Sequence, residues 1–315
     1  MVEQAPVPEG PTEIPAEEAA DPVAAGETGQ ELALVAPEPR IEMDAHAAPV
    51  VTPPGPRPRL PPDEPPAMRP GSGTIALIID DVGPAPAWSR RALALPGPLT
   101  MAFLPYADDL DALTAQARSR GHDIFLHMPM QPIGREDPGP NALLDGMDAA
   151  TLRQRLTWAI GRVSGAIGMN NHMGSRLTAE PEAMATVMDV LREHDLAFVD
   201  SRTSPRSVAD GAAEKAGIAH VGRDVFLDHF PGSAFVRRQL AEVERQARTN
   251  GSVVAIGHPL PATLEVLESW IPAAKARGFR FVGVSRIIAD RTCTKAPRPG
   301  CPSELTRVAA KATAP

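Results

Sequence analysis

From residue 74 onward, short runs of apolar residues alternate with longer stretches in which apolar residues recur every three or four positions. Continuous apolar runs are typical of strands buried on both faces, as in parallel sheets. Recurrence at three or four positions is typical of amphipathic helices. The pattern predicts strands at residues 74–80, 99–105, 122–128, 165–171, 196–201, 218–223, 252–258 and 279–285. It predicts helices at residues 109–121, 148–163, 180–194, 232–249 and 260–278.

Strands and helices that alternate in this way predict an α/β fold, with a regular or distorted (β/α) barrel as the first choice. An open doubly wound sheet is the alternative. Two irregular stretches interrupt the pattern, at residues 129–148, which are rich in Pro and Gly, and at residues 222–233. A loop as long as the first is usually functional or disordered when it occurs in a compact domain.

The first 72 residues differ in composition from the remainder. They hold 17 of the 36 prolines and no Phe, Tyr or Trp, and they carry 13 acidic against 4 basic residues. Such a segment cannot bury enough apolar surface to offset the entropy of ordering it. We therefore expect a disordered leader at 1–72, a barrel domain at 73–290 and a flexible tail at 291–315.

The charge of −8 belongs to the leader, because the remainder carries 27 basic and 26 acidic residues. A near-neutral domain gives no electrostatic reason to expect a nucleic-acid partner. The sequence also shows no apolar stretch long enough for a membrane span and no export signal at Met1. A leader of this kind often follows a membrane anchor, so tethering to the cell envelope is one expectation. Cys293 and Cys301 close a short Pro-Gly segment and form either a disulfide or two free thiols.

The predicted strands end in residues that can carry out chemistry. In parallel α/β folds, functional side chains gather at the carboxyl ends of the strands. The second strand ends in Leu104 and Pro105 and offers none. His229, beside Asp228, is a further candidate in the second irregular stretch. The other strand ends supply Asp80, Asp81, His127, Asn170, Asn171, His172, Asp200 and His258.

One carboxylate and two histidines form a common catalytic metal site with open positions for water. A divalent ion there lowers the pKa of its bound water from 15.7 to about 7 in favourable cases. One of two adjacent aspartates can bind the metal while the other accepts a proton, and a histidine can protonate the leaving group. Zinc is the default metal for such ligands, with cobalt, nickel and manganese as alternatives. The competing interpretation is that these polar residues only form hydrogen bonds at the strand ends.

Six motifs, taken in order, resemble the divergent polysaccharide deacetylase family, which is related to the metal-dependent polysaccharide deacetylases. They are IALIIDDVG, FLHMPMQP, DPGPNALL, GMNNHMGSRLT, FVDSRTSP and AIGHP, and they span roughly residues 74–290. The resemblance implies a distorted (β/α) barrel of seven to eight parallel strands and an extracytoplasmic location, in the periplasm or cell envelope. It also implies an acetylated glycan as the substrate.

The same resemblance implies roles for individual residues. Asp80 would be the general base and His258 the general acid, with Asp200 orienting that histidine. Asp81, His127 and His172 would bind the metal. We further expect substrate contacts from Ser175 and Asp228. Asn170 and Asn171 either contact the substrate, position His172 or cap the strand.

The sequence also departs from the deacetylase pattern. Typical metal-dependent deacetylases place both metal histidines in one His-x-x-x-His segment, whereas here the fourth residue after His127 is Gln131. The second histidine is therefore taken from the next strand, as His172. The usual Arg-Pro segment of the fourth strand and the tryptophan after the fifth strand are also absent. Two functions remain, a metal-dependent carbohydrate deacetylase and a weak or inactive metal-binding barrel that serves as an envelope scaffold.

Overall fold

The structure, a computed structural model, describes residues 73–293. The predicted leader and residues 294–315 of the predicted tail lie outside the described residues. Cys301 and the side chain of Cys293 also lie outside them, so the choice between a disulfide and free thiols stays a prediction.

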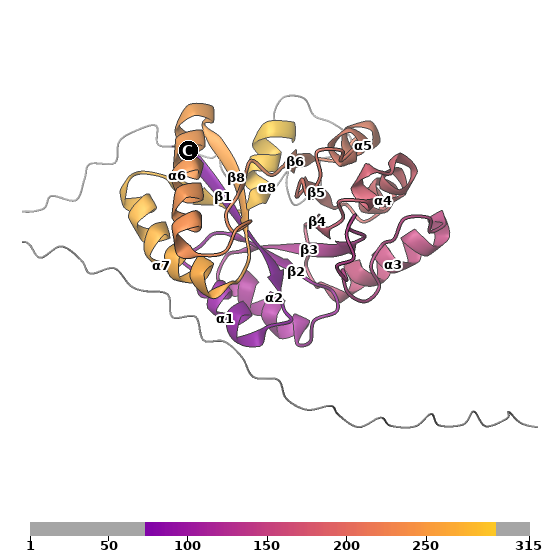
Figure 1. The fold of residues 1–315 in the computed structure, drawn as a ribbon, viewed down its shortest axis with the longest axis horizontal. Coiled ribbons are helices and arrows are strands. Elements are labelled where there is room, and N and C mark those ends of the chain that lie inside the picture. Colours follow the sequence, from indigo (N-terminus) through magenta and orange to yellow (C-terminus); the bar gives the residue numbers. More distant parts are fainter. Residues whose placement is uncertain (1–72, 294–315) are drawn as a thin grey trace, which may run out of the picture. The chain divides into compact units, whose positions relative to one another are not determined.

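A single curled sheet of parallel strands forms the centre of the fold (Figure 1). The strand order is β6-β5-β4-β3-β2-β1-β8-β7, with β9 paired to the start of β1. The predicted (β/α) barrel is confirmed as an open, distorted one, because the edge strands β6 and β7 follow one another in the chain without pairing. A doubly wound sheet would reverse its strand order at a switch point, and this sheet does not. The strands are β1 Thr74–Val82, β2 Thr100–Phe103, β3 Asp123–Met130, β4 Gly168–Met173, β5 Ala197–Asp200, β6 His220–Gly222, β7 Val225–Phe226, β8 Ser252–Gly257 and β9 Arg280–Val282.

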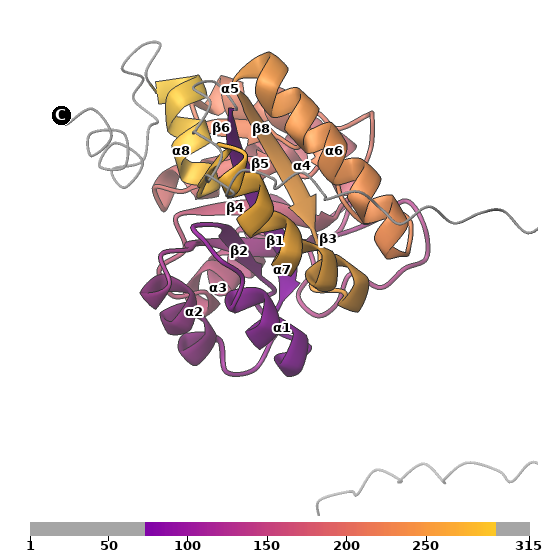
Figure 2. The same cartoon turned by 90° about the vertical axis from the view of Figure 1, so that its left-hand side faces the viewer.

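Helices cover the outer face of the sheet, and Figure 2 shows α6 and α7 side by side next to β1 and β8. All five predicted helices are present, and Asp148 caps α3 by accepting a hydrogen bond from the Thr151 backbone nitrogen at 2.8 Å. The sequence pattern missed α1, α5, α8 and the two-residue strand β7. Among the described residues, no helix is both long enough and apolar enough to cross a membrane. The helices are α1 Pro86–Leu93, α2 Leu110–Ser119, α3 Ala149–Arg162, α4 Pro181–Glu193, α5 Ala209–Ala216, α6 Ser233–Asn250, α7 Pro261–Ala276 and α8 Val284–Ile288.

Two apolar layers separate the inside of the barrel from its outside. The outer layer lies between the strands and the surrounding helices, and Ile79, Leu126 and Phe198 belong to it. The inner layer fills the barrel with alternate residues of the same strands, together with side chains from α8. Phe125 is fully buried there, and Gly168 makes room for its ring, since a Cβ at Gly168 would lie 2.4 Å from Phe125 Cζ.

The alternation of the inner layer determines which polar residues point into the barrel. Side chains two residues apart on a strand share a face, so the inward sequence Ala76, Ile78 on β1 continues to Asp80. The same step carries Val254 and Ile256 of β8 to His258. Polar residues therefore replace apolar ones above the inner core at the carboxyl ends of the strands. The inward positions so defined are Asp80, His127, Asn170, His172, Ser201 and His258.

The long loop of residues 129–148 is ordered and attached to the carboxyl end of β3. Met130 forms an isolated parallel bridge with Leu143, and the Gln131 side chain accepts a hydrogen bond from the Asp145 backbone nitrogen at 2.7 Å. Arg176 donates to the carboxylate of Asp145 at 2.8 Å from the opposite side. The loop is thereby fixed beside the strand ends that carry the polar residues.

Candidate metal centre

Asp81 reaches the strand-end cluster through an irregularity in β1. Regular alternation would turn Asp81 outward, on the same face as Ile79. Between Ile79 and Val82 the register with β2 shifts, and Asp81 adopts a φ of 53°, which is uncommon for a residue with a side chain. Such irregularities are frequent beside functional sites, where they re-aim a side chain. The result is that two adjacent aspartates, Asp80 and Asp81, line the same cavity.

Asp81, His127 and His172 each bring one potential ligand atom to within 4.8 Å of the other two. Asp81 Oδ1 lies 2.9 Å from His172 Nδ1 and 3.3 Å from His127 Nε2, and the two ring nitrogens lie 3.1 Å apart. Although this oxygen is buried and has two close nitrogens, it accepts no well-formed hydrogen bond. A buried carboxylate oxygen without a hydrogen bond, together with two imidazole nitrogens, is the set of ligand atoms expected for a divalent cation. The residues present therefore fit a metal ion.

Asn170 fixes the orientation of the His127 ring. Its Nδ2 donates to Asp80 Oδ1 at 2.8 Å and to Ser201 Oγ at 3.2 Å. A carboxylate only accepts, so the amide nitrogen must face Asp80 and the amide oxygen must face His127. His127 Nδ1 then donates to that oxygen, at 2.9 Å, and Nε2 faces Asp81 and His172. This second contact is what a metal-binding histidine requires.

Asp80 is 2% exposed and lies behind the three potential ligands. Its Oδ2 is 3.7 Å from His127 Nε2. Burial raises the pKa of Asp80, and the nearby His127 and His258 together with the Asn170 hydrogen bond offset part of that increase. A carboxylate with a raised pKa is a stronger base than an ordinary aspartate. Burial would also raise the pKa of Asp81, but its contacts with His127 and His172 outweigh it and hold that pKa well below the usual range.

His258 faces the same cavity from β8, with Nε2 4.0 Å from Asp81 Oδ2. Asp228 holds the ring, because its Oδ1 accepts from Nδ1 at 2.9 Å and its Oδ2 accepts from the His258 backbone nitrogen at 2.8 Å. Thr263 donates to the same Oδ2 at 2.8 Å. Burial alone would lower the pKa of His258, but Asp228 and the charges of Asp81 and Asp80 raise it to about 9. His258 is thus a protonated side chain at neutral pH that points into the cavity.

These contacts correct the partner expected for His258. Asp200 accepts hydrogen bonds from the Arg202 backbone nitrogen at 2.7 Å and from Ser207 Oγ at 2.8 Å, so its carboxylate stabilises the loop before α5. The physical reason is the alternation along β5, which places Asp200 on the outer face with Phe198. Asp228, which we expected to contact substrate, is the residue that orients the histidine.

The other expected substrate residues differ in how accessible they are. Asn170 is fully buried and occupied by Asp80, His127 and Ser201, so its expected contact with substrate is replaced by a positioning role. Asn171 is 1% exposed, and its amide bonds the Met173 carbonyl and the Ser201 backbone nitrogen. Ser175 lies on the wall of an adjoining cavity, where its hydroxyl accepts from the Ile133 backbone nitrogen at 2.8 Å.

Comparison with known proteins places this site in a family. The family model for divergent polysaccharide deacetylases matches residues 77–288, which include every residue of the strand-end cluster. The chain belongs to the divergent polysaccharide deacetylase family. It is 41% identical over 195 residues to an uncharacterized protein of Haemophilus influenzae, covering 62% of this chain and 70% of that protein. It is 35% identical over 200 residues to the uncharacterized protein YibQ of Escherichia coli, covering 64% of this chain but only 63% of YibQ.

A solved structure agrees with this assignment. The crystal structure of an uncharacterized protein from Agrobacterium tumefaciens C58 is 29% identical and superposes with a TM-score of 0.67. The match covers 70% of this chain and 91% of that one. The fold of this divergent polysaccharide deacetylase is therefore shared with an experimentally determined structure.

Sequence reasoning missed several residues of the cavity in this divergent polysaccharide deacetylase. The cavity has a volume of about 270 Å³, and its lining includes Ser201, Thr203, Arg223 and Phe226 beside the expected aspartates and histidines. Ser201 could have been found from the alternation of β5, since it follows the inward residues Ala197 and Val199. Arg223 and Phe226 gave no such signal, because they lie in the irregular stretch between β6 and α6.

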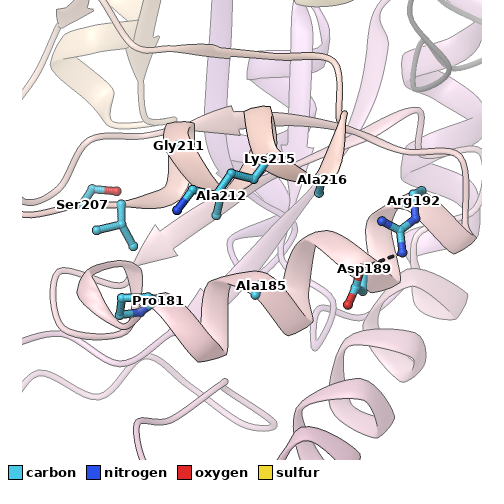
Figure 3. A pocket seen from close by; sticks show the side chains of 10 residues that line it. Pro181, Ala185, Asp189, Arg192, Ser207, Gly211, Ala212, Lys215 and Ala216 are labelled. Atoms are coloured by element: carbon cyan, nitrogen blue, oxygen red, sulfur yellow. Dashed lines mark hydrogen bonds and ion pairs between the residues drawn. The ribbon is translucent and has the colours of Figure 1, made fainter.

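A second, separate cavity of about 610 Å³ lies between α4 and α5 (Figure 3). Small and apolar residues such as Ala185 and Ala212 form much of its lining. Its charged pair, Asp189 and Arg192, is engaged in a 2.7 Å ion pair. No histidine or aspartate of the strand-end cluster lines it, so this cavity is separate from the candidate metal centre.

Proposed function

We propose that this divergent polysaccharide deacetylase is a metal-dependent hydrolase that removes N- or O-acetyl groups from a polysaccharide of the cell envelope. The single observation that carries the proposal is the convergence of Asp81, His127 and His172 between two further titratable groups, Asp80 and His258. A protein that only bound a metal or a glycan would have no need for a buried base and a protonated histidine facing one cavity.

Asp81, His127 and His172 would hold the ion, for which zinc is the first choice because two nitrogens and one oxygen form the donor set. When bound, a divalent ion would lower the pKa of a bound water and polarise a carbonyl oxygen. Asn170 engages Nδ1 of His127, so that Nε2 is the ring nitrogen that would bind the ion.

The protein's own side chains then move two protons. Asp80 accepts a proton from the water that attacks the acetyl carbonyl, and burial favours this by making its carboxylate more basic. His258 donates its Nε2 proton to the departing nitrogen or oxygen as the bond between carbonyl carbon and sugar substituent breaks. Acetate and the free amine or hydroxyl of the sugar are the products. Asp228 keeps His258 oriented and favours its protonated form before that transfer.

Membership of the family supports the substrate class and the location that we propose. An acetylated polysaccharide of the cell envelope requires the enzyme to be extracytoplasmic, and we propose that location on this ground. Tethering through the leader concerns residues outside the described part of the chain, and the described residues give it no support.

Acetate release from acetylated glycans by the purified protein tests the proposal. Asp80→Asn should retain the bound metal and lose turnover, whereas Asp81→Ala should lose both. Full turnover by Asp80→Asn would disprove the base assignment. Metal binding without acetate release from any N- or O-acetylated glycan would instead favour the scaffold function. The absence of some deacetylase motifs from the sequence is the observation that supports this alternative.

A further inference from the structure

The cavity at the strand ends continues outward into a second, larger one. The outer cavity has a volume of about 530 Å³, and it shares Met173, Thr203, Arg223 and Phe226 with the inner cavity. Pro132 and Glu136 of the long loop form part of its opposite wall. The outer cavity falls within the usual size range of ligand sites, and its connection to the inner one makes it the path along which a long substrate would lie.

Arg223 lies at the junction of the two cavities and is held rigidly there. It belongs to the two-residue connection between β6 and β7. Its Nε donates to the Ser201 carbonyl at 2.7 Å and its Nη2 donates to the Arg202 carbonyl at 2.9 Å. The guanidinium also stacks over the Phe226 ring, with Cζ 4.6 Å from the centroid.

Despite this fixation, Arg223 has no carboxylate partner. Among the described residues, no carboxylate oxygen lies within 4.0 Å of its guanidinium, whereas the neighbouring Arg202 forms a 3.0 Å ion pair with Asp210. Burial and the charge of Arg202 lower the pKa of Arg223, and the more distant Asp200 and Asp80 offset only part of this. A half-buried guanidinium without a counter-ion is held at a free-energy cost that an anionic ligand would remove.

The remaining wall of the outer cavity suits a sugar ring. His229 lies beside Phe226, with ring centroids 5.7 Å apart, and Phe226 in turn lies 5.6 Å from the ring of His258. The aromatic surface therefore runs without interruption from the general acid to the outer cavity. Glu136 is exposed on the opposite side, where a solvated carboxylate can accept hydrogen bonds from sugar hydroxyls.

We propose that the outer cavity binds a sugar unit that carries a carboxylate, with Arg223 as the residue that selects it. This inference rests on the proposed function, because it describes the unit next to the one that is deacetylated. Nη1 of Arg223 has no hydrogen bond within the described chain and is not among its buried unpartnered atoms, so it is free to donate to the ligand. The substrate is accordingly an acidic glycan.

Calorimetric titration with two oligosaccharides tests this inference without requiring turnover. The probes are oligomers of N-acetylglucosamine and the same oligomers with the C6 hydroxyls oxidised to carboxylates. All proteins carry Asp80→Asn, so that no product forms during the titration. The oxidised oligomer should bind about tenfold more tightly than the neutral one, the size expected for a hydrogen bond to a charged group.

Substitutions of Arg223 then identify the residue responsible. Arg223→Gln should remove the preference for the oxidised oligomer and weaken binding of the neutral one far less than binding of the oxidised one, and Arg223→Lys should retain part of the preference. The matched control is Arg120→Gln, which removes an exposed arginine at the end of α2, just before β3 and hence at the opposite edge of the sheet. It should leave both affinities unchanged.

Equal affinities of the Asp80→Asn protein with Arg223 intact for the two oligomers would overturn the proposal. An equal loss of both affinities in Arg223→Gln would also overturn it, since Arg223 would then only hold the loop after β5. A failure of the proposed function looks different. In that case the charge preference would persist while the enzyme with Asp80 intact released no acetate from either oligomer.

Discussion

Asn170→Ala provides a quantitative test of how the metal centre is supported. Asn170 is fully buried, and its amide is the link between Asp80, His127 and Ser201. Removal of the amide leaves a buried carboxylate oxygen and a buried imidazole N–H without partners. Each costs roughly 1–3 kcal/mol, so the free energy of unfolding should fall by about 2–6 kcal/mol when both are counted.

The same substitution should weaken metal binding, because His127 loses the contact that fixes its tautomer. Loss of such a contact typically costs about 10–100-fold in metal affinity. The assays are urea unfolding of chelator-treated protein and competition for zinc with a chromogenic chelator. Unfolding is measured without metal because a bound ion would itself add to the stability of the native state.

Asn171→Ala is the matched control for this experiment. Asn171 is the adjacent amide and is buried to the same degree, but it bonds only backbone groups of Met173 and Ser201. It should destabilise the protein by a similar amount while reducing zinc affinity by less than about threefold, because its side chain forms no hydrogen bond with any of the three potential ligands. The reasoning is refuted if both variants lose zinc affinity equally, or if Asn170→Ala binds zinc as well as the wild type.

Three further predictions concern the acid, the metal and the inner core. Turnover should decline as the pH rises through about 9, since His258 must be protonated to act and Asp228, together with the charges of Asp81 and Asp80, raises its pKa from 6.5 to about 9. Asp228→Asn should move this alkaline limb of the pH–rate profile to lower pH, and an unchanged limb would show that another group is the acid. Because the pKa of His258 is higher in the folded protein than in the unfolded chain, protonation of His258 stabilises the fold. This contribution is complete below about pH 6.5 and is lost as the pH rises through about 9. Chelator treatment should lower the Tm of the wild type but not that of Asp81→Ala, and an equal decrease in both would place the metal elsewhere. Phe125→Ala should reduce the free energy of unfolding by about 3–5 kcal/mol because it empties the middle of the inner layer, and a loss below about 1 kcal/mol would mean that Phe125 does not fill the barrel.

The sequence pattern was sufficient for the fold because most strands are buried on both faces. All eight predicted strands are present, and the missed strand β7 has only two residues, too few for any periodicity. The helices α1 and α5 were missed because each is eight residues long. Their apolar faces are built largely from small residues such as Ala92 and Ala213, which give a weak periodic signal.

The candidate site was predictable only where the strand is regular. His127, His172 and His258 stand at inward positions that follow from counting alternate residues. Asp200 was given a role that the same count would have denied, since Phe198 and Asp200 lie on the outer face. Asp81 could not have been placed by counting, because the register shift in β1 and its φ of 53° redirect it. The position of Arg223 depends on how β6 and β7 are joined, which no local pattern encodes.

The most direct test of the account is the zinc content of the full-length protein after incubation with zinc and desalting. The wild type should retain about one equivalent of zinc. The variant Asp200→Asn should retain the same amount, because the Asp200 side chain lies on the outer face of the sheet. The double variant Asp81→Ala/His172→Ala should retain none. Equal metal contents in the wild type and the double variant would contradict the site, and an absence of metal from the wild type would remove the hydrolytic mechanism altogether.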